Sequence, residues 1–267
     1  MSTSYPVNPN PTLISTGTLG NTERTDAWWL EPTLVVLALI VFGIYGMWAG
    51  LQGVNFQVLT PSGHELYLSP FYSPLLVQNF PVSPAILVMW IPLGFRATCY
   101  FYRRCYHRAF FMNPPSCAVT GMCTKKPGQE SGYTGEQKFP FILNNLHRYF
   151  LYLAIILTAF HWYHTVNAFS HLPEVGLRAG MVVFLIDAIF LSLYVFSCHS
   201  WRHWLGGKLD KFTANAFSKL RYAGWLRVSH LNENHGLWAW ISLFTVGFAD
   251  FYVRMVASGA WQDIKLF

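Results

Sequence analysis

Five stretches of mostly apolar residues recur along the 267-residue chain, separated by more polar connections. A helix needs about 20 apolar residues to cross the hydrocarbon core of a bilayer. The pattern therefore predicts an all-α integral membrane bundle of five transmembrane helices, at about 33–51, 82–102, 147–167, 177–199 and 234–257. Pro84 falls in the first turn of the second stretch, and Pro92 is expected to kink it. Residues 1–32 are predicted to form an N-terminal tail ahead of an anchor domain at 33–267.

Composition agrees with a lipid-facing surface. The chain is 53% hydrophobic and 18% aromatic but only 11% charged, whereas a soluble globular domain carries about 25% charged residues. This composition excludes intrinsic disorder, which needs low hydrophobicity and high charge. It also disfavours a soluble enzyme.

The basic residues predict the orientation. Residues 103–146 and 200–233 carry six Lys or Arg residues each, whereas 52–81 and 168–176 carry none. Because Lys and Arg concentrate in cytoplasmic loops, both basic loops are predicted to be cytoplasmic, with the N-terminus inside and the C-terminus outside. The cytoplasmic loops then account for the net charge of +6. No nucleic-acid partner is needed to explain it, and none is expected.

Cysteine and histidine gather at the predicted cytoplasmic helix ends. Cys99 and Cys198 end the second and fourth spans, and His147 and His235 begin the third and fifth. His199 and His203 follow Cys198, while the remaining cysteines, Cys105, Cys117 and Cys123, lie in the first basic loop. Cysteines on the reducing side are better candidates for metal ligands than for disulfides.

The residues leave the metal open. Two imidazoles facing each other would hold a b-type haem, and two thiolates with two imidazoles would hold a Rieske-type [2Fe–2S] cluster. The same four would also suit structural zinc. The alternative is that these residues only populate an interface and cap helices.

Ionisable residues inside the spans form a second group. His161, His164, Asp187, Asp250 and Arg254 lie toward the predicted outer half, and Arg96 lies in the second span. Such residues are costly in a membrane and are functional by default, so a quinone or proton route is predicted. The alternatives are an ion pair between Asp250 and Arg254, and an Arg96 side chain that reaches the surface.

Long motifs resemble a known family. RATCYFYRRCYHRAFFMNPPSCAV from Arg96, GEQKFPFILNNLHRYF from Gly135, SCHSWRHWLGG from Ser197 and LNENHGLWAWISLFTVGFADFYVRMVASG from Leu231 resemble the single-subunit, five-helix membrane anchor of actinobacterial-type succinate dehydrogenase. The resemblance covers nearly the whole chain. It implies a subunit of succinate:quinone oxidoreductase in the bacterial plasma (inner) membrane. That subunit passes electrons from an iron–sulfur subunit, docked on the cytoplasmic face, to menaquinone or another quinone.

In this family succinate oxidation is expected in a partner flavoprotein subunit, so no catalytic residue is assigned to this chain. The resemblance implies a Rieske-type [2Fe–2S] cluster held by four of Cys99, Cys117, Cys198, His147, His199, His203 and His235. Trp201 and Arg202, within the third motif, join the quinone or proton candidates. A dihaem b-type anchor and a small transporter remain alternatives, and a homo-oligomer of the complex stays open.

Overall fold

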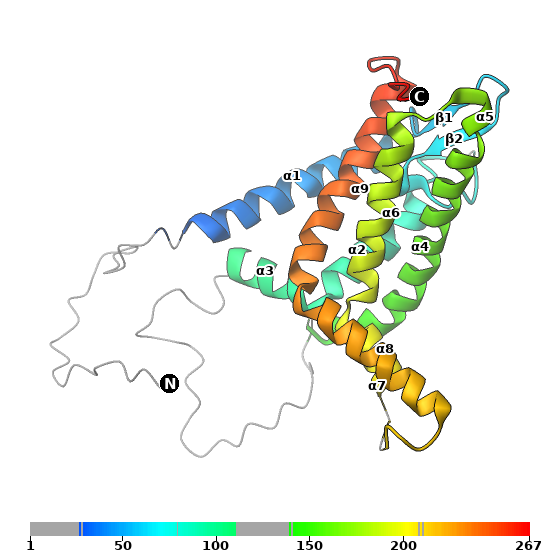
Figure 1. The fold of residues 1–267 in the computed structure, drawn as a ribbon. Helices are drawn as coiled ribbons and strands as arrows, with labels where there is room; N and C mark the ends of the chain where they lie inside the picture. The colour runs from blue at the N-terminus through cyan, green and yellow to red at the C-terminus, as the bar shows by residue number, and fades with distance from the viewer. Residues whose placement is uncertain are drawn as a thin grey trace, which may run out of the picture.

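The computed structural model describes residues 27, 29–78, 80–110, 139, 141–207, 209 and 211–267. Within this part the chain is mostly helical. Four long helices run along one bundle, with α1 inclined to the others (Figure 1): α1 (Leu30–Gln52), α4 (His147–Ser170), α6 (Ala179–Phe196) and α9 (His235–Ala257). Helix α1 begins at Leu30, so the predicted tail ends slightly earlier than residue 32. Most of the tail and Cys117 lie outside the described residues.

The second predicted span is two helices, not one. Helix α2 (Ile86–Thr98) ends before Cys99, and α3 (Tyr100–Phe110) continues from it. The expectation for Pro84 was wrong, because it precedes the helix. The chain breaks at Cys99, whereas Pro92 remains inside α2. The fourth span also ends early, at Phe196. It is followed by α7 (His199–Gly206) and α8 (Ala216–Glu233), which project from the same end of the bundle (Figure 1).

The expectation of an all-helical chain missed a small sheet. Strands β1 (Gln57–Leu59) and β2 (Glu65–Leu68) form an antiparallel hairpin in which Val58 pairs with Tyr67. The hairpin packs against α4 and α9, followed by a short 3₁₀ helix (Pro70–Tyr72). A second 3₁₀ helix (Phe141–Leu146) leads into α4, and α5 (Leu172–Val175) links α4 to α6.

Three helices in the described part of the chain are long and apolar enough to cross a membrane: α1, α6 and α9. Helix α2 is apolar but has only 13 residues. Helix α4 has 24 residues, yet its His, Arg and Asn side chains keep it outside that group. Three of the five expected spans are therefore long and apolar enough to cross a membrane among the described residues, and the count of five stays a prediction.

Three apolar cores hold the bundle together. One contains Cys99 and Cys198 and lies where α2 and α6 end and α4 and α9 begin; we call this the cluster end. The other two surround Tyr67 and Tyr72 at the opposite end, beside the β-hairpin; we call this the hairpin end. Because sequential helices run in alternate directions, residues far apart in sequence meet at each end.

Candidate metal centre

Two apolar helices each end beside a cysteine, and the chain changes direction at each of these two cysteines. Cys99 lies between α2 and α3 with φ −65° and ψ 132°. Cys198 lies between α6 and α7 with φ −61° and ψ 140°. Extended dihedrals interrupt a helix, and both side chains are only 2% exposed within one apolar core. The sequence thus buries two thiols at two matching helix breaks.

Two histidines begin the helices that face these breaks. His147 is the first residue of α4, and His235 is the first residue of α9. His147 Nε2 lies 3.1 Å from Cys198 Sγ, and His235 Nε2 lies 3.5 Å from Cys99 Sγ. We call Cys99, His147, Cys198 and His235 the Cys/His cluster. It brings together four of the seven ligand candidates.

Hydroxyl groups fix the tautomers of both histidines. Thr98 Oγ1 lies 3.0 Å from His147 Nδ1, and Ser197 Oγ lies 2.7 Å from His235 Nδ1. Each hydroxyl also donates to a backbone carbonyl of its own helix. A hydroxyl has a single hydrogen, so each Nδ1–H donates to the hydroxyl oxygen. Each Nε2 therefore presents its lone pair toward a cysteine sulfur, as a metal-binding imidazole does when its other nitrogen is held by a hydrogen bond.

An aromatic ring covers each imidazole. Phe95 stacks on His147 with ring centroids 4.7 Å apart, and Tyr194 stacks on His235 at 5.2 Å. Both aromatic residues stand four positions before a cluster cysteine, giving FRATC and YVFSC. This repeated pattern, aromatic-x-x-Thr/Ser-Cys, was the sequence signal for four supporting residues that the sequence interpretation missed.

Arg96 places a positive charge beside the cluster. Its guanidinium donates to Tyr102 OH at 2.5 Å and to Ser242 Oγ at 3.1 Å, and it lies 4.6 Å from the centre of the Tyr194 ring. It therefore turns inward onto α9. Tyr194 OH is buried and has no hydrogen-bond partner among the described residues.

The donor atoms do not converge as ligands of one ion. In the part of the chain that is described, no group of three or more His, Cys, Asp or Glu side chains is arranged to hold a single metal ion. The Cys/His cluster instead forms two sulfur–nitrogen pairs.

The other two histidine candidates lie away from the cluster. His199 and His203 are exposed on α7, and His203 Nδ1 lies 3.1 Å from the Arg148 guanidinium. They share a face with each other, but the break at Cys198 points α7 in a new direction. The expectation that His199 and His203 lie beside the cluster assumed one continuous helix, whereas α6 and α7 are separate helices.

Trp201 and Arg202 hold α7 in place. Trp201 stacks on Trp204 and packs against the core of the cluster end. Arg202 Nε donates to Ser229 Oγ at 2.7 Å, and its guanidinium lies 4.7 Å from the Trp225 ring centre. Arg202 thus joins α7 to α8.

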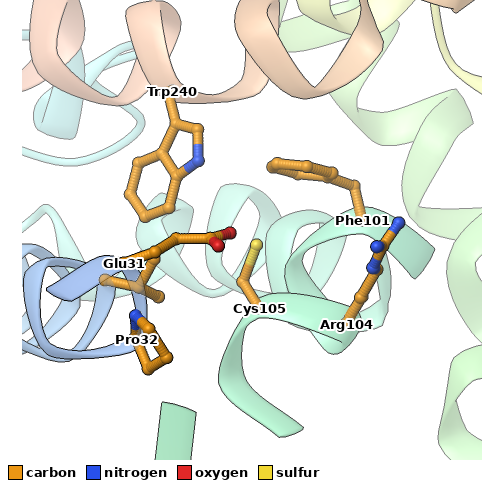
Figure 2. Close-up of a pocket in the computed structure, with 7 residues that line it drawn as sticks. Glu31, Pro32, Phe101, Arg104, Cys105 and Trp240 are labelled. Atoms are coloured by element: carbon orange, nitrogen blue, oxygen red, sulfur yellow. The ribbon is translucent and has the colours of Figure 1, made fainter. Parts of the chain in front are cut away.

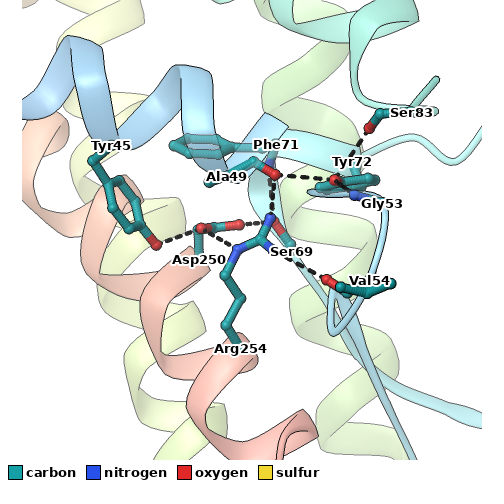
Figure 3. A network of polar contacts seen from close by, with 10 residues as sticks. All are labelled: Tyr45, Ala49, Gly53, Val54, Ser69, Phe71, Tyr72, Ser83, Asp250 and Arg254. Carbon is teal, nitrogen blue, oxygen red and sulfur yellow. Dashed lines mark hydrogen bonds and ion pairs between the residues drawn. The ribbon is translucent and has the colours of Figure 1, made fainter. Parts of the chain in front are cut away.

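Asp250 and Arg254 form a buried ion pair near the hairpin end (Figure 3), with 2.9 Å between Asp250 Oδ2 and Arg254 Nε. Tyr45 OH donates to the same carboxylate at 2.5 Å, and Ser69 Oγ donates to its other oxygen. The Arg254 guanidinium also donates to the carbonyl of Ala49 at 2.6 Å. This network ties α9 to the end of α1 and to the hairpin, which accounts for the burial of both charges.

The remaining buried candidates are dispersed. Asp187 accepts a 3.0 Å hydrogen bond from Thr245 Oγ1. His161 Nδ1 lies 2.8 Å from the Leu157 carbonyl within α4. His164 Nδ1 lies 2.8 Å from Glu65 Oε1 of the hairpin. Neither histidine belongs to the Cys/His cluster.

A pocket of about 300 Å³ lies between α1, α3 and α9, next to the cluster end. Figure 2 shows Glu31, Cys105 and Arg104 around it, with the Phe101 and Trp240 rings on its inner side. Tyr102, whose ring meets that of Trp240 edge to face at 5.9 Å, separates it from Tyr194. The pocket is therefore about one layer of aromatic rings away from the Cys/His cluster.

Comparisons with known proteins agree with the resemblance seen in the motifs. The model of the family described as actinobacterial succinate dehydrogenase subunit SdhC matches residues 30–259. A solved chain from the Mycobacterium smegmatis Sdh1 complex in the apo form is similar, with 35% identity and a TM-score of 0.79. The match covers 97% of this chain and 98% of that one. A search of curated proteins found no match.

Proposed function

Because this chain belongs to the actinobacterial succinate dehydrogenase SdhC family, we propose that it carries electrons from a docked iron–sulfur subunit to a membrane quinone. The chain is a membrane subunit of succinate dehydrogenase, and its solved relative is part of a complex. Succinate oxidation belongs to a partner flavoprotein subunit. The observation that carries the electron-transfer role is the Cys/His cluster, buried at one end of the bundle.

The donor set of the cluster fits a Rieske-type [2Fe–2S] centre. Such a centre takes two thiolates on one iron and two imidazoles on the other, and the cluster holds two cysteines and two histidines, each imidazole facing a thiol. Each Nε2 presents its lone pair to a cysteine sulfur, because the hydroxyls hold the opposite nitrogens. A b-type haem is disfavoured, since each Nε2 is directed at a sulfur and not at the other imidazole.

When bound, such a centre supplies a one-electron step between the soluble subunit and a quinone that needs two electrons. The residues around the Cys/His cluster suit such a centre. The apolar core excludes water, and Arg96 offers a positive charge that favours the more negative, reduced state. The Tyr194 hydroxyl is able to donate a hydrogen bond to a cluster sulfur. Hydrogen bonds to sulfur change the reduction potential of an iron–sulfur centre.

The pocket beside the cluster end offers a place for the quinone ring. Its wall of Phe101 and Trp240 suits an aromatic ring, and Glu31 and Arg104 bring polar atoms to its rim (Figure 2). A transporter is the weaker alternative, because Asp250 and Arg254 are tied into a network that joins three segments. We propose that the cluster end faces the cytoplasmic side of a bacterial plasma membrane, because the basic helices α3, α7 and α8 lie at that end.

The cofactor is tested on the purified complex with all its subunits. Cys198→Ser and His235→Gln should remove a dithionite-reducible [2Fe–2S] EPR signal and the quinone reductase activity. His203→Gln, which changes the same residue type as His235 outside the cluster, should keep both. Cys105→Ser, which changes a cysteine outside the cluster, should keep the EPR signal. Flavin content and gel filtration show whether each variant assembles. A Soret band in place of the EPR signal, or a signal that survives both cluster substitutions, contradicts the assignment.

The quinone pocket has its own test. Val35→Trp fills the pocket, whereas Val41→Trp changes a residue of the same helix that is 65% exposed and lies elsewhere. We expect Val35→Trp to raise the KM for quinone while the EPR signal stays unchanged. Equal KM values for the two variants would exclude this pocket.

A further inference from the structure

The pocket between α1, α3 and α9 contains a carboxyl group. Glu31 is the one acidic residue among the described residues that line it. Its carboxylate points into the pocket, toward Cys105 and Trp240 (Figure 2). Glu31 lies in the first turn of α1 and is exposed. Its side chain therefore reaches both water and the place proposed for the quinone ring.

Quinone reduction needs protons at this place. A quinone becomes a quinol by gaining two electrons and two protons, so a proton must reach each of its oxygens. Three of the described lining residues have no ionisable group: Pro32, Val35 and Phe101. The guanidinium of Arg104 keeps its protons in a protein, and the indole of Trp240 only donates a hydrogen bond. These five side chains therefore do not transfer a proton.

A carboxyl group and a thiol are the lining groups that both take up and release protons, and they belong to Glu31 and Cys105. Tyr102 stands behind the aromatic wall, but its hydroxyl already donates to the Ala239 carbonyl at 2.6 Å. Cys105 is half-buried, whereas Glu31 is exposed and is able to recover a proton from water. Glu31 is therefore the better proton donor of the two.

Arg104 complements Glu31 from another helix. It lines the same pocket from α3 and is exposed at its rim (Figure 2). A quinone oxygen gains negative charge as electrons arrive, and a guanidinium stabilises such an oxygen by donating hydrogen bonds to it. The pocket thus offers a cation to hold the oxygen and a carboxyl group to protonate it.

We propose that Glu31 is a catalytic residue of quinone reduction, which delivers protons from water to a quinone bound in this pocket. This inference rests on the proposed function, which supplies the quinone and its electrons. In each transfer the O–H bond of the Glu31 carboxyl group breaks and an O–H bond forms on a quinone oxygen. A proton from water then restores the carboxyl group. Two such transfers balance the two electrons that the docked iron–sulfur subunit supplies, and Glu31 itself is neither oxidised nor reduced.

The test uses the complete purified complex, with succinate as the electron donor and menadione as the quinone. Glu31→Gln keeps the size of the side chain but has no proton to release. Glu31→Asp keeps a carboxyl group, and Glu31→Ala makes room for added formate, a small acid that can take its place. Glu233→Gln, which neutralises an exposed carboxylate at the end of α8, is the control. Ferricyanide accepts electrons without protons, so its reduction reports succinate oxidation independently of the proton step.

We expect Glu31→Gln to lower the kcat of menadione reduction by about 100-fold, as the loss of a positioned acid does. The EPR signal, the flavin content and ferricyanide reduction should stay at wild-type levels, and Glu233→Gln should keep the wild-type kcat. Glu31→Asp should retain most of the activity, and formate should restore Glu31→Ala.

An acid in the first turn of a helix also stabilises the helix dipole, but a purely structural role would not respond to formate. A wild-type kcat in Glu31→Gln overturns the proposal, and so does a loss that neither Asp nor formate restores. Failure of the proposed function shows itself separately, as an unchanged KM for quinone in Val35→Trp or as the absence of a reducible signal in the wild-type complex.

Discussion

Cys99 and Cys198 occupy equivalent positions, each being the extended residue at which an apolar helix gives way to a helix of new direction. The equivalence extends to the residue before each cysteine, a hydroxyl donor, and to the aromatic residue four positions earlier. Each histidine is held by the hydroxyl of one repeat and faces the thiol of the other. The two repeats are therefore interlocked, and neither half completes the site alone.

The hydroxyl groups should matter for cofactor retention. Ser197→Ala and Thr98→Val remove the acceptors that orient His235 and His147. Losing such a supporting contact typically costs about 10–100-fold in metal affinity. We expect less iron and acid-labile sulfide per flavin in both variants, and full content in Ser258→Ala, which lies at the opposite end of α9. Full iron content in all three would contradict the role of the hydroxyls.

Tyr194→Phe tests the unpaired phenol. The ring still stacks on His235, but the buried O–H that we propose donates to sulfur is gone. A hydrogen bond to a charged acceptor contributes about 1.5–3 kcal/mol, so the midpoint potential should fall by on the order of 100 mV for a one-electron couple. Redox titration by EPR measures it. Tyr149→Phe, on an exposed position of α4, serves as the control. A potential equal to wild type would mean that Tyr194 only packs.

The sequence predicted which helix ends come together better than which of their side chains meet there. Helix ends carrying Cys99, His147, Cys198 and His235 follow from the apolar periodicity, because each residue borders a long apolar run. His199 and His203 were grouped with them because i, i+4 spacing puts them on one helical face. That reasoning assumes a continuous helix, and the extended residue at Cys198 breaks it.

The β-hairpin and the hydrogen-bond network around Asp250 could not be predicted from hydrophobic periodicity, for a different reason. Strands of three and four residues give too little alternation to stand out from a loop. The partners of Asp250, namely Tyr45, Ser69 and Arg254, come from three separate segments. Only the i, i+4 pair with Arg254 is local, and it was the single contact that the sequence indicated.

Acid should loosen the turn of the β-hairpin. Glu174 accepts from the Ser62 backbone N–H at 3.0 Å. The pKa of Glu174 is lowered mainly by a hydrogen bond from the Ser62 side chain, and the backbone N–H of Ser62 lowers it further. A depressed folded pKa stabilises the contact above the unfolded value, about 4.3 for Glu, and the contribution is lost as the pH falls through the folded pKa. Hydrogen exchange at the Ser62 amide, corrected for its intrinsic rate, should therefore accelerate below that range. Glu174→Gln should show no such pH dependence; an identical acid response in that variant would assign the loosening to another group.

The orientation of the subunit can be read with a membrane-impermeant maleimide. Ser62→Cys puts a thiol at the hairpin end, which the basic loops predict to be outside. We expect intact cells to label Ser62→Cys and not wild type or Lys219→Cys, whose position on α8 is predicted to be cytoplasmic. Inside-out vesicles should reverse the result for Lys219→Cys. Labelling of Lys219→Cys in intact cells would invert the topology.

Asp250→Asn separates a structural ion pair from a proton route. The substitution keeps the shape of the side chain but leaves Arg254 as a buried cation without its counter-charge. Breaking a buried pair in this way costs about 3–5 kcal/mol, which should lower the Tm of the purified complex by roughly 10 °C. Glu233→Gln, which neutralises an exposed carboxylate at the end of α8, should leave the Tm unchanged. At a temperature where the variant remains folded, quinone reduction should match wild type, because Asp250 lies 15 residues from His235 on α9, about 22 Å of helical rise. A normal Tm with lost activity would instead assign Asp250 to proton or quinone transfer.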